Sequence, residues 1–132
     1  MREFDTDTLR IIAAFENITG TEVRDCIRND SIFFLVNEGK VAIAIGKNGQ
    51  MIKTAERLLG KPIRVFEWAT DPKNFIKNMI PQAQKIEIEK NGATVSINSK
   101  DRGTVIGKGG YHINIIREFL ERNSDVKSLR VV

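Results

Sequence analysis

Apolar residues along the chain follow one pattern that occurs twice. In each copy a helix-like spacing comes first, two strand-like runs follow, and then come a glycine-rich loop, a second helical stretch and a short strand. Apolar residues three and four positions apart predict a helix, whereas strict alternation or a short continuous run predicts a strand. The pattern therefore predicts the order α-β-β-α-α-β, twice.

In the first copy, the helix is expected to begin at Thr6 or Asp7, whose side chains can cap it, and to end at Gly20. Strands are expected over residues 22–28 and 31–37, and the second is so continuously apolar that both of its faces should be buried. The remaining expected elements are a short helix over 38–45, a longer helix over 49–59 and a strand over 63–68.

The second copy is expected to open with a helix at Asp71-Pro72, because proline is favoured in a first helical turn, and Pro81 ends it. Residues 85–89 and 93–97 alternate apolar and polar side chains, as half-buried strands do. Between them, Asn91-Gly92 can take the positive backbone angles of a tight hairpin. The remaining expected elements are a short helix over 100–106, a longer helix over 110–122 and a strand over 129–132.

The two copies keep a fixed displacement. Ile45-Gly46-Lys47-Asn48-Gly49 returns as Ile106-Gly107-Lys108-Gly109-Gly110, displaced by 61 residues. The same displacement maps Val36 onto Ile97 and Leu59 onto Leu120, so the apolar register is preserved on both sides of the loop. Such a match indicates a duplicated unit. We expect two small α+β domains, residues 1–69 and 70–132.

The linker near Ala69-Thr70-Asp71 is very short and contains no glycine-serine tract. We therefore expect the two domains to pack against each other as one rigid body. Trp68 lies at the seam, where its ring can anchor that packing or stack on a base.

Each glycine loop lies between two predicted helices. The start of the following helix presents N–H groups without intrahelical acceptors, and these attract phosphate together with the positive end of the helix dipole. Glycine at both ends of the loop lets a sugar-phosphate backbone approach the main chain without meeting a Cβ. Lys47 and Lys108 add positive charges that require no particular base.

Charge supports the same interpretation when it is considered locally. The net charge of +4 on 132 residues allows an acidic partner without identifying one. No aspartate or glutamate occurs over residues 39–55 or 102–117, which contain the two loops. Some apolar residues beside the loops must be core, and others can floor a groove for the unstacked bases of a single strand. The candidate RNA-binding residues are Lys40, Ile45, Gly46, Lys47, Asn48, Gly49, Lys53, Arg102, Ile106, Gly107, Lys108, Gly109, Gly110 and Arg117.

Other uses of glycine-lysine loops fail on spacing. A P-loop requires Ser or Thr after G-x-x-x-x-G-K, and neither Gly46-Lys47 nor Gly107-Lys108 is followed by one. His112 is the only histidine and Cys26 the only cysteine, so no metal site, disulfide or catalytic triad is expected. We expect Cys26 to be buried and His112 to pack near the surface or to contact RNA. Neither an enzyme nor a cofactor is expected.

The apolar runs are much shorter than the roughly 20 residues that span a membrane. The amino terminus lacks a basic-then-apolar signal pattern. A cytoplasmic monomer without a membrane partner is therefore expected.

The element order and the I-G-K-x-G motif of both copies resemble the type II KH fold. Two such modules joined almost without a linker resemble the KH pair of NusA, and a chain of only that pair resembles the archaeal NusA-like transcription factors. The resemblance implies a three-stranded sheet with helices on one face in each module. It further implies binding of single-stranded RNA in transcription termination or antitermination, with RNA polymerase as a partner. Without the amino-terminal polymerase-binding domain and the S1 module of the bacterial protein, polymerase contact is expected to need another subunit.

Three other functions stay open. A KH protein of ribosome assembly or RNA decay would have the same loops. A nucleotide-binding enzyme is disfavoured by the loop spacing, and a protein-protein adaptor is disfavoured by the lysines in both loops.

Overall fold

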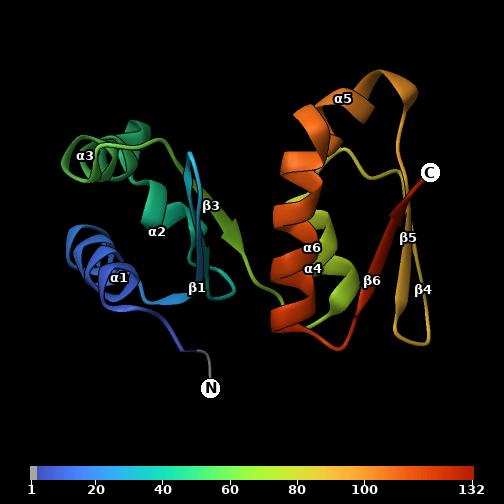
Figure 1. Cartoon of the computed structure of the whole chain (residues 1–132), viewed down its shortest axis with the longest axis horizontal. Helices are drawn as coiled ribbons and strands as arrows, with labels where there is room; N and C mark the ends of the chain where they lie inside the picture. The colour runs from blue at the N-terminus through green and yellow to red at the C-terminus, as the bar shows by residue number, and fades with distance from the viewer. Residues whose placement is uncertain (1–2) are drawn as a thin grey trace. The chain divides into compact units, whose positions relative to one another are not determined.

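The computed structural model describes residues 3–132 and divides into two compact units, Met1–Trp68 and Ala69–Val132. Both units have the predicted order of helices and strands, with short 3-10 turns added around the glycine loops (Figure 1). In each unit the helices cover one face of a three-stranded sheet. The fold class is therefore α+β, as the sequence predicts.

In the first unit the middle strand pairs antiparallel with one neighbour and parallel with the other. This mixed sheet has the order β1-β2-β3. The elements are α1 (Thr6–Thr19), β1 (Val23–Arg28), β2 (Ile32–Val36), α2 (Val41–Ile45), a 3-10 turn (Lys47–Gly49), α3 (Gln50–Leu59) and β3 (Ile63–Glu67).

The second unit repeats this topology, with the sheet order β4-β5-β6 and a parallel pair between β5 and β6. Its elements are α4 (Pro72–Met79), β4 (Lys85–Glu89), β5 (Gly92–Ser96), a 3-10 turn (Ser99–Asp101), α5 (Arg102–Ile106), a 3-10 turn (Lys108–Gly110), α6 (Tyr111–Asn123) and β6 (Ser128–Val131).

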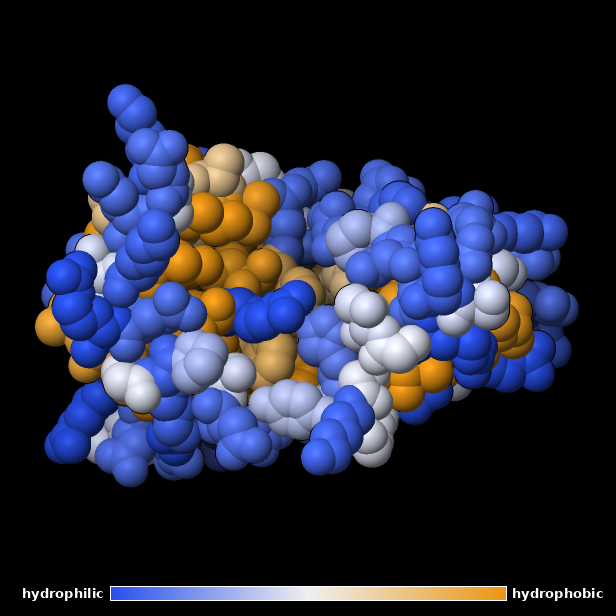
Figure 2. Space-filling view, turned by 90° about the horizontal axis from the view of Figure 1, so that it is seen from above, coloured by the Kyte–Doolittle hydropathy of each residue, from blue (hydrophilic) through white to orange (hydrophobic). Residues whose placement is uncertain are grey.

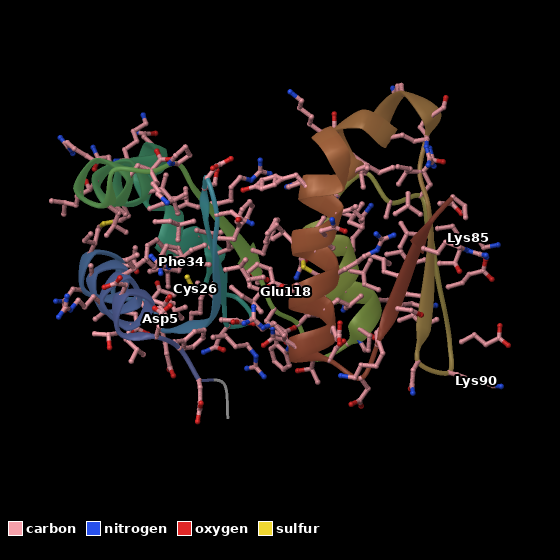
Figure 3. The ribbon with its side chains drawn as sticks, in the orientation of Figure 1. Asp5, Cys26, Phe34, Lys85, Lys90 and Glu118 are labelled. Carbon is pink, nitrogen blue, oxygen red and sulfur yellow. The ribbon has the colours of Figure 1, made fainter. Side chains whose placement is uncertain are left out.

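The core of the first unit lies between its helices and its sheet. The ring of Phe34 stacks on that of Phe15 at 3.9 Å between centroids, and Cys26 is buried beside them, as predicted (Figure 3). Ala44 and Ala55 are fully buried, and their small side chains let α2 and α3 approach the sheet. Every residue of β2 is buried, which confirms that both of its faces are covered.

The second unit builds its core from α6 and β5, and the two units differ on the other face of the sheet. Val95 of β5 and Phe119 of α6 are fully buried. The alternate residues of β5, such as Thr94 and Ser96, are polar and only partly buried. Because β-strand side chains alternate between faces, this sheet has one apolar face and one polar face.

Helix α1 begins one residue earlier than predicted. The capping residue is Asp5, not Thr6 or Asp7, and its Oδ1 accepts the N–H of Thr8 at 2.7 Å. Asp5 keeps an extended backbone, which a capping residue requires, while Thr6 is already helical. The predicted end at Gly20 is confirmed, because Gly20 adopts the left-handed conformation.

The hairpin between β4 and β5 also turns one residue earlier than predicted. Glu89 pairs with Gly92, so the two turn residues are Lys90 and Asn91, and Lys90 takes the positive φ of 57° at the hairpin tip (Figure 3). Gly92 is instead part of β5, where a Cβ would lie 3.0 Å from Oγ of Ser128. β6 therefore approaches closely at this position, and a larger residue there would require the Ser128 side chain to shift.

The two short helices α2 and α5 begin later than predicted. Gly39 interrupts the first with a φ of 81°, and Glu67 Oε1 accepts the N–H of Val41 at 3.3 Å where α2 begins.

Within residues 3–132, no helix is long and apolar enough to cross a membrane.

Candidate nucleic-acid interface

The first glycine loop is a tight turn between α2 and α3. Gly46 has φ 80° and ψ 169°, a conformation that is almost restricted to glycine. Its carbonyl accepts the N–H of Gly49 at 3.0 Å. A Cβ on Gly46 would lie 2.5 Å from Cγ and 2.9 Å from the backbone N of Met51. Both the backbone angles and this close approach therefore require glycine.

The second loop has the same backbone shape. Gly107 has φ 75° and ψ 169°, and its carbonyl accepts the N–H of Gly110 at 3.1 Å. A Cβ on Gly107 would lie 2.8 Å from Cβ of His112, so this histidine packs against the loop from the first turn of α6. Asn48 and Gly109 occupy equivalent left-handed positions, with φ of 56° and 64°. Asparagine tolerates that conformation better than most residues, so the two sequences give one geometry.

The last glycine of each loop has open space around it. Gly49 and Gly110 are left-handed, but the nearest atoms to an added Cβ are Lys53 Cε at 3.9 Å and Asn114 Nδ2 at 3.6 Å. These are ordinary contact distances. A side chain at either position would therefore obstruct a ligand on the loop without forcing the loop apart.

A cavity of about 350 Å³ lies beside the second loop. Its apolar residues come from α5, α6 and β6, and its three arginines come from the same three elements. Such an apolar floor with cations around it suits a base together with its phosphates. The lining residues are Arg102, Ile106, Gly109, Gly110, Ile113, Asn114, Arg117, Arg130 and Val131.

The structure brings together five residues that the sequence singles out in the second unit. These five, which all line the cavity, are Arg102, Ile106, Gly109, Gly110 and Arg117. The other two predicted residues lie beside the cavity: Gly107 closes the turn, and Lys108 is exposed on it.

In the first unit the three predicted lysines, Lys40, Lys47 and Lys53, are all exposed around the loop. Ile45 is 37% exposed, whereas Ala44 beside it is fully buried. The same division occurs in α5, where Val105 is buried and Ile106 lines the cavity. This confirms the expectation that some apolar residues beside the loops are core while others are accessible.

Apolar side chains are exposed mainly in the first unit. Figure 2 shows apolar atoms open to solvent over this unit, at the left of the view, with hydrophilic groups around them. Its large exposed apolar side chains are Leu9, Ile43, Ile45, Met51 and Leu58.

Sequence reasoning missed Arg130 and Val131 of β6, together with Ile113 and Asn114 of α6. Equivalent positions in the two third strands, β3 and β6, can be matched through their pairing. Ile63 pairs with Ile32, and Leu129 pairs with Ala93. Arg64 and Arg130 directly follow Ile63 and Leu129, so they occupy equivalent positions. They are separated by 66 residues and not 61, because both α6 and the connection that follows it are longer than their equivalents in the first unit.

Trp68 has a cationic partner within its own unit. The guanidinium of Arg24 lies 3.7 Å from the ring centroid, and Arg24 Nη1 donates to Asn37 Oδ1 at 3.3 Å. The Arg24 guanidinium therefore covers one face of the indole. Among residues 3–132, no cluster of three or more metal-ligating side chains occurs.

Comparison with known proteins agrees with this geometry. A model of the KH domain matches residues 10–69. A Halococcus morrhuae protein named "Probable transcription termination protein NusA" is 33% identical, over 99% of this chain and 99% of its own length. A Methanocaldococcus jannaschii protein of the same name is 32% identical, over 96% of this chain and 73% of its own. The crystal structure of APE1850 superposes with a TM-score of 0.76 at 29% identity, covering 98% of this chain and 100% of that one.

Proposed function

The chain belongs to the family of archaeal NusA-like transcription factors, which contain RNA-binding KH domains, and we propose that both of its units are type II KH modules that hold single-stranded RNA on their glycine loops. The protein is an RNA-binding protein and not an enzyme.

One observation carries this proposal: two different four-residue sequences adopt the same loop geometry in two separate units. Gly46 and Gly107 share a backbone conformation that other residues rarely adopt, and the carbonyl of each accepts a hydrogen bond from the N–H of the fourth loop residue. A packing turn alone does not explain why exposed lysines occupy the second position of both loops.

Binding would divide between the loop and the groove. The loop and the first turn of the following helix offer N–H groups and positive charge to phosphates, with Lys47 and Lys108 beside them. The apolar floor beside the second loop, including Ile106 and Ile113, receives an unstacked base. Each loop clamps about four nucleotides, and the two units bind one continuous strand.

The names of the relatives support a role for this binding in transcription. The protein acts on nascent RNA during termination or antitermination, as a cytoplasmic monomer with RNA polymerase as a partner. Affinity purification of the tagged protein tests the context: polymerase subunits in the eluate support it, whereas ribosomal or exosome proteins contradict it.

Loop variants test the RNA site directly. Gly49→Asp and Gly110→Asp each place a carboxylate where phosphate is expected, in space that the fold leaves open. We expect each to weaken binding of a labelled single-stranded RNA of about eight nucleotides by roughly tenfold or more, measured by fluorescence anisotropy.

The matched control is Gly60→Asp, which adds the same carboxylate at a left-handed glycine in open space, at the end of α3 that is far from the loop. It brings the same charge and the same backbone strain outside the proposed site, so its affinity should equal that of the parent. Parent-like binding by both loop variants would show that the loops do not hold RNA.

A further inference from the structure

One helix position carries opposite charges in the two units. Glu56 of α3 and Arg117 of α6 are displaced by 61 residues, as the glycine loops are. Each lies seven residues after the last glycine of its loop. The two side chains therefore occupy the same turn of equivalent helices.

Each side chain forms a hydrogen bond with the start of the third strand of its unit, β3 or β6, but one side chain accepts and the other donates. Glu56 Oε2 accepts the N–H of Ile63 at 2.8 Å, whereas Arg117 Nε donates to the carbonyl of Leu129 at 3.1 Å. Ile63 and Leu129 are equivalent, because they pair with Ile32 and Ala93. An ionised carboxylate only accepts hydrogen bonds and a guanidinium only donates them. One structural position is thus an acceptor in the first unit and a donor in the second.

The bond to Leu129 fixes one edge of the Arg117 guanidinium. Arg117 also lines the 350 Å³ cavity, together with Ile113 one turn earlier on α6. A guanidinium has five N–H donors in a rigid fork, and Nε uses one of them here. The terminal Nη groups are therefore a pair of donors whose plane is already oriented before a ligand enters.

The place of Arg117 along α6 favours a base over a phosphate. Seven residues of helix separate it from Gly110, which is roughly 10 Å along the helix axis. Phosphates are expected to bind at the loop itself, beside Lys108 and the N–H groups at the start of the helix. A base that extends from a phosphate at the loop across the apolar floor would present its edge near Arg117.

We propose that Arg117 is a specificity-determining residue that selects guanine in the second unit, and that the first unit, with Glu56 in its place, does not make this selection. Guanine presents two adjacent acceptors, O6 and N7, which match the paired donors of an arginine fork. Adenine replaces one of these acceptors with an amino donor. The inference rests on the proposed binding of single-stranded RNA to the loops.

The test uses labelled uridine decamers with one central nucleotide replaced by guanine, adenine or cytosine, measured by anisotropy with the full chain. The parent should bind the guanine decamer roughly tenfold tighter than the adenine decamer. Arg117→Lys keeps the charge but loses the fork, so it should bind the two decamers about equally. A decamer with 7-deazaguanine, which lacks the N7 acceptor, should lose most of the preference with the unaltered parent.

Two further variants separate base selection from general attraction. Arg102→Ala and Arg130→Ala remove exposed cations from the same cavity and should weaken all decamers by a similar factor. Arg117→Met, which keeps the apolar stem, repeats the test if the lysine variant has a lowered melting temperature.

The outcomes are distinct. Equal affinity of the parent for all decamers, or a uniform loss in Arg117→Lys, would overturn the role of Arg117 and leave RNA binding intact. No binding to any decamer would overturn both this inference and the proposed function.

Discussion

At the scale of single residues, the glycines of each loop have different roles. Gly46 and Gly107 are required by the fold, because their backbone angles and their contacts with the following helix exclude a Cβ. Gly49 and Gly110 lie in open space, so a substitution there mainly affects what approaches from outside. Stability and binding can therefore be separated within one four-residue motif.

This separation predicts unequal costs for alanine. Gly46→Ala should destabilise the protein by about 3 kcal/mol, since strain at such backbone angles costs about 1–3 kcal/mol and the contact with Met51 adds to it. Gly49→Ala should cost only about 1 kcal/mol, the ordinary penalty of a left-handed alanine. Urea denaturation followed by circular dichroism measures both.

The same comparison can be made in the second unit with Gly107→Ala and Gly110→Ala. Equal shifts of the denaturation midpoint for the first and last glycines of a loop would contradict the distinction.

At the scale of helices and strands, the cap of α1 makes a pH-dependent contribution to the stability of the folded protein. The N–H of Thr8 donates to the carboxylate of Asp5 and lowers the pKa of that carboxyl below its ordinary value of 3.8; Arg28, at 3.6 Å, acts in the same direction. The folded state thus binds this proton less readily than the unfolded state does. The stabilisation is present above the unfolded pKa and is lost as the pH falls through the folded pKa.

Substitution of Asp5 should reproduce this dependence. Asp5→Ala should lower the melting temperature at neutral pH, and the difference from the parent should shrink as the pH falls below 3.8. Asp5→Asn is the matched control, because asparagine caps a helix without titrating. If the difference in melting temperature between parent and Asp5→Ala stayed constant down to acidic pH, ionisation of Asp5 would contribute nothing to stability.

The elements themselves could be predicted from periodicity, and glycine marked the end of α1 correctly, whereas several other boundaries could not be predicted. Asp5, Thr6 and Asp7 are all good capping residues, so sequence alone does not choose among them. The hairpin turns one residue earlier because Gly92 pairs with Glu89 inside β5, where it lies close to Ser128 of β6, a residue distant in sequence. Arg130 could not be predicted as a site residue from the repeat, because the extra length of α6 and of the connection that follows it breaks the 61-residue displacement before β6 begins.

At the scale of the whole molecule, duplication of the unit gives the chain two loops of one shape with different surroundings. The second loop has a cavity lined by Arg102, Arg117 and Arg130. The first unit keeps only one of these arginines, as Arg64 in place of Arg130; Val41 and Glu56 stand in place of Arg102 and Arg117, and the exposed cations nearest the loop in the chain are Lys40, Lys47 and Lys53. Because arginine offers directional paired donors and lysine a mobile charge, the second unit is better suited to base recognition and the first to holding the backbone.

If both units engage one strand, affinity must depend on RNA length in a way that neither unit alone would give. An RNA of about four nucleotides fills one loop, whereas one of about eight or more can reach both, and linked sites can raise affinity by roughly a hundredfold. We expect the parent to show this rise in anisotropy titrations of single strands from about four to about sixteen nucleotides. Gly110→Asp should bind the shortest RNA through the first loop and lose most of the rise. A parent whose affinity does not increase with length would show that the two units bind separate strands.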